Sequence, residues 1–125
     1  MGCKMLKMDK IHEDKRGEIY SITGDLKDDE IVVFTCKKGK SRGGCIHNIN
    51  DEYFVVLEGT IKYKIGDDVE MYSKGMAGFV PSKTPHYFVA QTDCIVAEWG
   101  ATIQEKKEKH LETRKIVDEI NEKTA

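Results

Sequence analysis

Residues 42–59 read RGGCIHNINDEYFVVLEG, and this stretch decides the fold. Cys45 and His47 are two residues apart, so on a β-strand both side chains would leave from the same face. Residues 48–51 include two Asn and one Asp, which is typical of a turn, and Glu52 opens a second apolar strand that can fold back beside the first. We therefore expect cysteine, histidine and glutamate to converge on one face of a sheet.

A second stretch supplies another histidine. Residues 75–86 read GMAGFVPSKTPH, in which His86 directly follows a turn that contains two prolines. Imidazole, carboxylate and thiolate groups are ligands of transition metals. We predict a mononuclear site for a divalent transition metal (Zn, Fe, Mn or Ni), with the ligands Cys45, His47, Glu52 and His86. If Cys45 is instead a packed thiol, the site has three protein ligands and open positions for water or substrate. The alternative is a polar pair on an outer sheet face and a histidine that caps a turn.

These two stretches resemble the two sequence motifs of the cupin superfamily. The first motif, a His-x-His followed by Glu and then Gly, is matched from residue 45 to residue 59, with Cys45 at the position of the first His. The second motif is matched by Gly75, Pro81 and His86, with Lys83 where the motif has Gly. The resemblance implies an all-β fold of the cupin type, a jelly-roll β-barrel.

The hydrophobic pattern points to the same fold class. Segments 30–36 and 94–99 are rich in β-branched and aromatic residues, and 60–65 alternates between apolar and polar residues. Turn residues separate about nine or ten such short strands, a pattern typical of a sandwich or barrel.

The composition changes at residue 103. The segment 103–125 contains no Gly or Pro and many Glu and Lys residues spaced four apart, which predicts a C-terminal α-helix. A chain of 125 residues with 39% hydrophobic residues suits one core. We therefore expect one domain, with a barrel over 1–102 and an appended helix over 103–125. The helix would dock through a small apolar patch or remain a solvated tail; the patch is Ile116, Val117 and Ile120.

Charge and cysteine content exclude several classes of protein. Lys and Arg number 20 and Asp and Glu number 22, and the net charge of −2 argues against a nucleic-acid or anionic-membrane partner. No apolar run is long enough to span a bilayer, and the first residues lack the apolar segment of a signal peptide. The four cysteines show no CxxC spacing. We expect a cytoplasmic protein with free thiols.

A narrower resemblance concerns the reaction. Arg42-Gly43-x-Cys45-Ile46-His47, with Asp14-Lys15-Arg16-Gly17 upstream, looks like small cupins that modify nucleotide sugars. These include dTDP-keto-sugar epimerases and ketoisomerases and the zinc-holding cupin domain of certain UDP-sugar reductase-epimerases. Glu52 favours the metal-dependent members, because the metal-free ketoisomerases usually lack this Glu. The resemblance implies epimerisation or isomerisation of a keto-sugar, through proton abstraction next to a carbonyl that the metal polarises.

This hypothesis gives roles to further residues. His47, when it is not a metal ligand, is a candidate base, and Tyr87 is a candidate acid. Arg42 and Lys62 are predicted to bind substrate through a diphosphate, and Tyr63 to line the substrate site. For each aromatic residue a place in the core or at the rim is the alternative, and for each cation a place on the surface.

Two other functions stay open at this point. A metal-dependent small-molecule oxygenase would need redox-active iron with open coordination positions. A non-catalytic cupin would bind a sugar derivative or another metabolite. In each case we expect a small-molecule ligand. The resemblance also implies a homodimer, formed through sheet edges and exchanged terminal strands, because pairing protects exposed strand edges.

Overall fold

The computed structural model describes residues 8–22, 30–101 and 108–123. Within these ranges the chain forms ten β-strands and one α-helix. The elements are β1 (Met8–Asp14), β2 (Gly17–Ile22), β3 (Ile31–Cys36), β4 (Ser41–Cys45), β5 (Glu52–Glu58), β6 (Thr60–Ile65), β7 (Asp68–Ser73), β8 (Ala77–Val80), β9 (His86–Ala90), β10 (Cys94–Trp99) and α1 (Leu111–Lys123).

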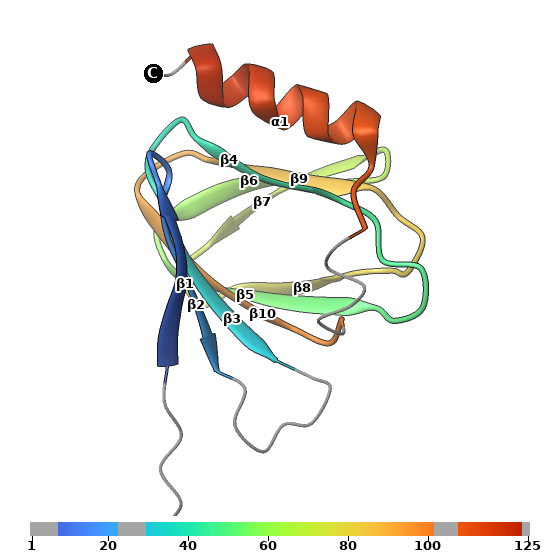
Figure 1. Ribbon diagram of the computed structural model, residues 1–125, viewed down its shortest axis with the longest axis horizontal. Helices are drawn as coiled ribbons and strands as arrows, with labels where there is room; N and C mark the ends of the chain where they lie inside the picture. Colours follow the sequence, from blue (N-terminus) through green and yellow to red (C-terminus); the bar gives the residue numbers. More distant parts are fainter. Residues whose placement is uncertain (1–7, 23–29, 102–107, 124–125) are drawn as a thin grey trace, which may run out of the picture.

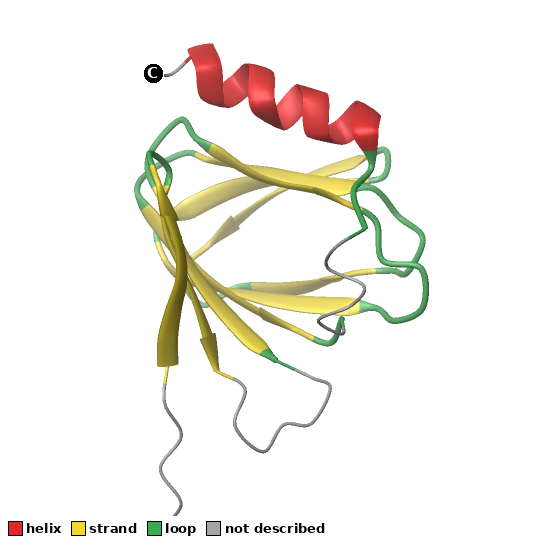
Figure 2. Ribbon diagram, viewed as in Figure 1, coloured by secondary structure: helices red, strands yellow, loops and turns green. Residues whose placement is uncertain are grey.

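The strands form two antiparallel sheets that face each other (Figures 1 and 2). The larger sheet has the strand order β1-β2-β3-β10-β5-β8, and the smaller has the order β4-β9-β6-β7. The helix lies outside the smaller sheet, along β4 (Figure 1). This arrangement confirms the prediction of an all-β jelly-roll fold with a C-terminal helix.

The side chains of alternate strand residues point inward and fill the space between the two sheets. On β5, Phe54 and Val56 are almost completely buried, whereas Tyr53 and Leu57, which point to the opposite face, are exposed. Phe88 from β9 packs against Phe34 from β3, with ring centroids 5.6 Å apart. Glu52 has the same inward parity as Phe54, so the first residue of β5 carries a carboxylate into the interior.

The first strand differs from the sequence prediction. The sequence suggests a turn over 12–17, but β1 continues to Asp14 and only residues 15–16 form the turn to β2. Every residue of β1 is exposed, and its polar side chains pair with each other, as His12 does with Asp14 at 2.9 Å. An exposed edge strand has no hydrophobic alternation, so the pattern could not reveal it.

The C-terminal segment covers the edge of β4. The backbone NH of His110 donates to the carbonyl of Gly44 at 2.9 Å. Gly44 has a φ of +86°, and a Cβ there would lie 2.9 Å from the Cα of Arg114, so glycine permits the close approach of the helix. Near the other end of α1, the Asn121 amide accepts from the backbone NH of Ser41 and donates to its carbonyl, at 2.8 and 3.1 Å.

The helix docks through part of the predicted apolar patch. Val117 of that patch is completely buried and Ile120 is half-buried, whereas Ile116 is 40% exposed and Thr113, outside the patch, is buried. Residues 108–110 are not helical, so α1 begins at Leu111 rather than at residue 103; the predicted boundary at 102/103 lies outside the described residues. No helix in the described ranges is long and apolar enough to cross a membrane.

Candidate metal centre

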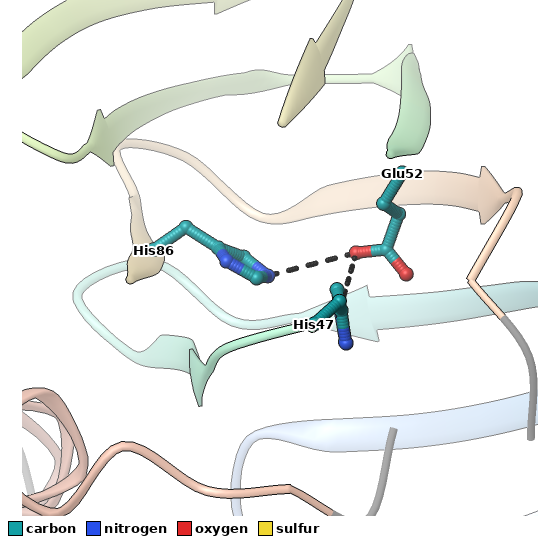
Figure 3. A group of neighbouring side chains, drawn as sticks. All are labelled: His47, Glu52 and His86. Carbon is teal, nitrogen blue, oxygen red and sulfur yellow. Dashed lines mark hydrogen bonds and ion pairs between the residues drawn. The ribbon is translucent and has the colours of Figure 1, made fainter. Parts of the chain in front are cut away.

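Three of the predicted metal ligands meet inside the barrel (Figure 3). His47 lies in the loop after β4, Glu52 begins β5 and His86 begins β9. Nε2 of His47 lies 3.3 Å from Oε1 of Glu52, and Nε2 of His86 lies 3.6 Å from the same oxygen. The three ligand atoms are within 4.8 Å of one another, and each residue is at most 3% exposed.

Two loops are fastened together to form this cluster. The backbone NH of Lys83 donates to the carbonyl of His47 at 2.6 Å, and the NH of Ser82 donates to the Asp51 carboxylate at 2.8 Å. Lys83 has a φ of +63°, in the left-handed region that favours glycine. The conformation explains why the second cupin motif has Gly at this position, although this chain has Lys.

Hydrogen bonding prepares His86 to bind a cation. Its Nδ1 lies 2.9 Å from the carbonyl oxygen of Thr84, and because a carbonyl only accepts, Nδ1 must carry the proton. Nε2 is then the nitrogen that faces Glu52: with its proton it donates to the carboxylate, and without that proton it offers a lone pair to a metal ion. A backbone carbonyl that fixes the tautomer in this way is a common feature around metal-binding histidines.

Glu52 supplies the negative charge of the cluster. Burial opposes its ionisation, but the hydrogen bonds to His47 and then His86 outweigh this effect and lower the pKa of Glu52 to about 2. Among the described residues, its second oxygen, Oε2, has no hydrogen-bond partner although it is buried. An ionised carboxylate with an unsatisfied buried oxygen, beside two imidazoles, fits a divalent transition metal.

Cys45 stands apart from this group. Its sulfur is not among the ligand atoms that lie within 4.8 Å of one another, although Cys45 lines the same cavity. Burial, and then the charges of Glu98 and Glu52, raise the pKa of its thiol to about 11. Before metal binds, the thiol is therefore protonated at neutral pH, and its predicted role as a fourth ligand stays a prediction.

The cluster lies in the wall of a cavity of about 390 Å³. The other lining residues that bear on chemistry include Arg42, Tyr63, Glu98 and Arg114. Tyr63 is 3% exposed, and burial, followed by the charge of Glu98, raises the pKa of its phenol well above the usual value. Tyr63 therefore keeps its proton and can act as a hydrogen-bond donor within the cavity.

Comparison with known proteins agrees with the geometry. A family model described as "Cupin domain" matches residues 32–100, which is more than half of the chain. The chain belongs to the cupin family. No curated protein sequence matches this cupin.

Solved structures share the fold of this cupin at low sequence identity. KdgF from Halomonas sp. superposes with a TM-score of 0.65 at 18% identity, over 77% of this chain and 86% of that protein. An RmlC-like cupin from Shewanella frigidimarina gives a TM-score of 0.65 at 17% identity, over 82% of this chain and 88% of that protein. CapF from Staphylococcus aureus, a capsular polysaccharide assembling protein, gives 0.62 at 21% identity, over 81% of this chain but only 29% of CapF.

Two predicted site residues are not brought into the cavity of this cupin. Tyr87 follows His86 on β9 and therefore points to the opposite face of the sheet, and Lys62 on β6 is exposed beside the inward Tyr63. Neither is among the residues that line the cavity. Strand alternation turns both side chains away from the metal ligands, so this geometry does not support the roles of Tyr87 as acid and Lys62 as substrate ligand, which stay predictions.

Glu98 is one of the cavity residues that the sequence does not single out, as are Glu30 and Arg114. It lies on β10, two and four residues after the buried Val96 and Cys94, so alternation turns its carboxylate inward. A single glutamate at an inward position of an apolar strand was the available signal. It was overlooked because the segment was interpreted only as a buried strand.

Proposed function

We propose that this cupin binds a divalent transition metal through His47, Glu52 and His86 and catalyses the epimerisation or isomerisation of a keto-sugar. The support is the buried cluster in a cavity that also presents the carboxylate of Glu98 and the phenol of Tyr63. A Lewis-acid site, a carboxylate base and a protonated acid are the groups that proton transfer next to a carbonyl requires.

Each group has one task in the proposed reaction. A bound metal ion would supply Lewis-acid polarisation of the substrate carbonyl. His47 and His86 act as metal ligands in this proposal. The role of catalytic base, which the metal-free hypothesis gives to His47, is therefore given to Glu98. Glu98 removes the proton from the carbon next to the carbonyl, and Tyr63 donates a hydrogen bond to the developing enolate oxygen. Return of a proton to the enolate completes the isomerisation or epimerisation and restores the carbonyl.

Metal content tests the first part of this proposal. Untagged protein purified without chelators is expected to hold near-stoichiometric metal by plasma mass spectrometry, and a His47→Ala, His86→Ala double variant is expected to hold none. Cys45→Ala is the matched variant that decides whether the thiol is an essential ligand. Wild-type protein that holds no metal after reconstitution with Zn, Fe, Mn or Ni would refute the metal site.

Proton exchange tests the reaction. In D₂O, the metal-loaded protein is expected to introduce deuterium next to the carbonyl of a keto-sugar, as followed by NMR, and Glu98→Gln is expected to abolish this exchange while metal content is retained. Iron in the purified protein, with substrate-dependent oxygen consumption and no exchange, would instead establish an oxygenase. Binding without either reaction would establish a metabolite-binding cupin.

We also propose that the protein forms a homodimer through the outer face of the larger sheet. Phe79, Tyr53 and Trp99 are neighbours across β8, β5 and β10, and they are 52%, 43% and 40% exposed. Their rings follow one another at centroid distances of 6.2 and 6.0 Å. A contiguous exposed aromatic row on a sheet is typical of an interface.

Sedimentation velocity tests the dimer. The wild type is expected to sediment as a dimer, and Tyr53→Asp as a monomer, because a charge at the centre of the row cannot be desolvated without a partner. Val69→Asp, at a similarly exposed position on β7, is the matched control and should stay dimeric. A monomeric wild type would refute the proposal.

A further inference from the structure

Arg42 is an unusual residue of the cavity wall because it is a buried cation. It is 5% exposed, and burial, followed by repulsion from Arg16, lowers its pKa. Nε and Nη2 both donate to the carbonyl of Thr35, at 3.1 and 2.9 Å. The guanidinium carbon lies 5.7 Å from the centre of the Phe34 ring. These contacts fix the orientation of the guanidinium without neutralising its charge.

Among the described residues, none pairs with the remaining nitrogen of Arg42, Nη1. Within the described ranges, no residue accepts a hydrogen bond from Nη1, and no carboxylate lies within ion-pair distance of the guanidinium. A buried charge without a counterion is costly, since the interior screens it poorly. The group lines the 390 Å³ cavity, so a bound anion can supply the missing charge.

Two further arginines lie around the same strand. Arg16 donates from Nη1 to the carbonyl of Ser41 at 3.4 Å, and Arg114 donates from Nη1 to the carbonyl of Gly43 at 3.0 Å. They thus contact the residues on either side of Arg42. Arg16 is neutralised by Asp14 at 2.6 Å and Arg114 is 3.7 Å from Asp118, so Arg42 is the cation of this group that lacks a carboxylate.

The cavity also contains negative groups, which restrict where an anion can bind. Glu30 lines the cavity and accepts a hydrogen bond from Ser21 at 2.6 Å, and Glu98 lines it on β10. These carboxylates repel an anion and can accept hydrogen bonds from hydroxyl groups. Of the lining residues, the Arg42 guanidinium is therefore the group best suited to an anionic substituent, and a polyhydroxylated ligand suits the rest.

We infer that the cavity takes a small acidic sugar derivative, whose carboxylate or phosphate monoester pairs with Nη1 of Arg42. This inference rests on the proposed function for the sugar class and narrows it. A cavity of 390 Å³ is at the small end of the range of about 300–1,000 Å³ for ligand sites. It suits a single sugar unit, whereas a nucleoside diphosphate sugar is much larger than one sugar unit and would leave its nucleotide outside.

Calorimetric titration of wild-type protein is the test, with four probes of one sugar series: D-glucose, D-glucuronate, D-glucose 6-phosphate and UDP-glucose. We expect at least one of the two small acids to bind about 10- to 100-fold more tightly than glucose, the effect of one charged hydrogen-bonded contact. The stronger of the two identifies the anion as carboxylate or phosphate. Binding of glucose as tight as that of both acids, or of UDP-glucose tighter than either, would overturn the inference.

Inorganic phosphate provides a probe that is independent of the sugar. It is expected to raise the midpoint of thermal unfolding of the wild type above that in chloride of equal ionic strength, and this gain should vanish in Arg42→Gln. Arg42→Lys keeps the positive charge and should retain part of the rise in the unfolding midpoint. This second variant keeps the test available if Arg42→Gln does not fold. Equal midpoints in phosphate and chloride for the wild type would refute the anion site.

Metal removal separates this inference from the proposed function. The titrations are repeated on chelator-treated protein, and metal content is measured on every sample. Anion preference that persists without metal supports Arg42 as the partner, even if the protein proves to have no metal-dependent activity. Anion preference that disappears with the metal and survives Arg42→Gln would place the anion on the metal ion and overturn the inference.

Discussion

Replacement of Glu52 by Gln isolates the electrostatic contribution of the buried carboxylate to the stability of the metal-free protein. The substitution keeps the shape of the side chain and removes its charge. In the folded protein, burial opposes ionisation, but the hydrogen bonds to His47 and His86 lower the pKa of Glu52 from the usual 4.5 to about 2. At about 1.4 kcal/mol for each pKa unit, this difference is worth roughly 3 kcal/mol.

The direction of the pH effect follows from linkage. Above about pH 4.5 the carboxylate is ionised in both the folded and the unfolded chain, so the full stabilisation is present. As the pH falls towards about 2, the unfolded chain takes up a proton before the folded one, and the stabilisation is lost. We therefore expect wild type to be roughly 3 kcal/mol more stable than Glu52→Gln at pH 5, and the two to converge near pH 2.

Urea unfolding in the presence of a chelator measures this difference. Other acidic groups, such as Asp14, whose pKa the Arg16 guanidinium lowers, titrate in both proteins and cancel in the comparison. Glu58→Gln, at an exposed carboxylate of the same strand, is the control and should show little dependence on pH. A gap between wild type and Glu52→Gln that stays constant from pH 5 to pH 2 would show that the histidines do not stabilise the carboxylate.

Three further predictions concern the loops, the helix and the thiol. Lys83→Gly removes the strain of a left-handed backbone, about 1–2 kcal/mol, but adds an entropic cost of about 0.5–1 kcal/mol. Urea unfolding should therefore show a net increase in the free energy of unfolding, which Lys83→Ala should lack. Asn121→Ala removes two hydrogen bonds to Ser41 and should cost about 1–3 kcal/mol, against less than about 0.5 for the exposed Glu119→Ala. Burial raises the pKa of the Cys45 thiol from 9.0 to about 11, so at pH 8 alkylation of Cys45 should be about 100-fold slower in the folded metal-free protein than in urea. Peptide mapping measures both rates, and equal rates would contradict the burial of the thiol.

Motif spacing was enough to predict the core of the candidate site. His47, Glu52 and His86 were placed together from the sequence, and the structure brings them within 4.8 Å. The reasoning about backbone was less accurate for His47. It was expected on a strand with Cys45, but β4 ends at Cys45 and His47 lies in a loop that Lys83 holds. Bonds between two loops distant in sequence leave no periodic signal, so the pattern of one segment could not show them.

Strand register accounts for the other differences. Once His86 is taken as an inward ligand, alternation turns Tyr87 outward, and the same rule turns Lys62 outward beside Tyr63. Both outcomes could have been deduced from the sequence, as could the inward position of Glu98. The docking of α1 was predicted only in part: Val117 of the predicted patch is buried, but the contact of Asn121 with the β4 edge consists of hydrogen bonds, which leave no apolar periodicity.

The position of α1 has a consequence for how such a protein can diverge. The same 13-residue helix shields the edge of β4 from intermolecular pairing and carries Arg114 into the cavity wall. Insertions or substitutions that shift the helix by a fraction of a turn would alter ligand preference while the three metal-binding side chains, held by other elements, stay in place. Ligand selectivity and reaction chemistry can therefore evolve separately in this chain. Ligand selectivity and resistance to aggregation cannot, because both depend on the position of α1.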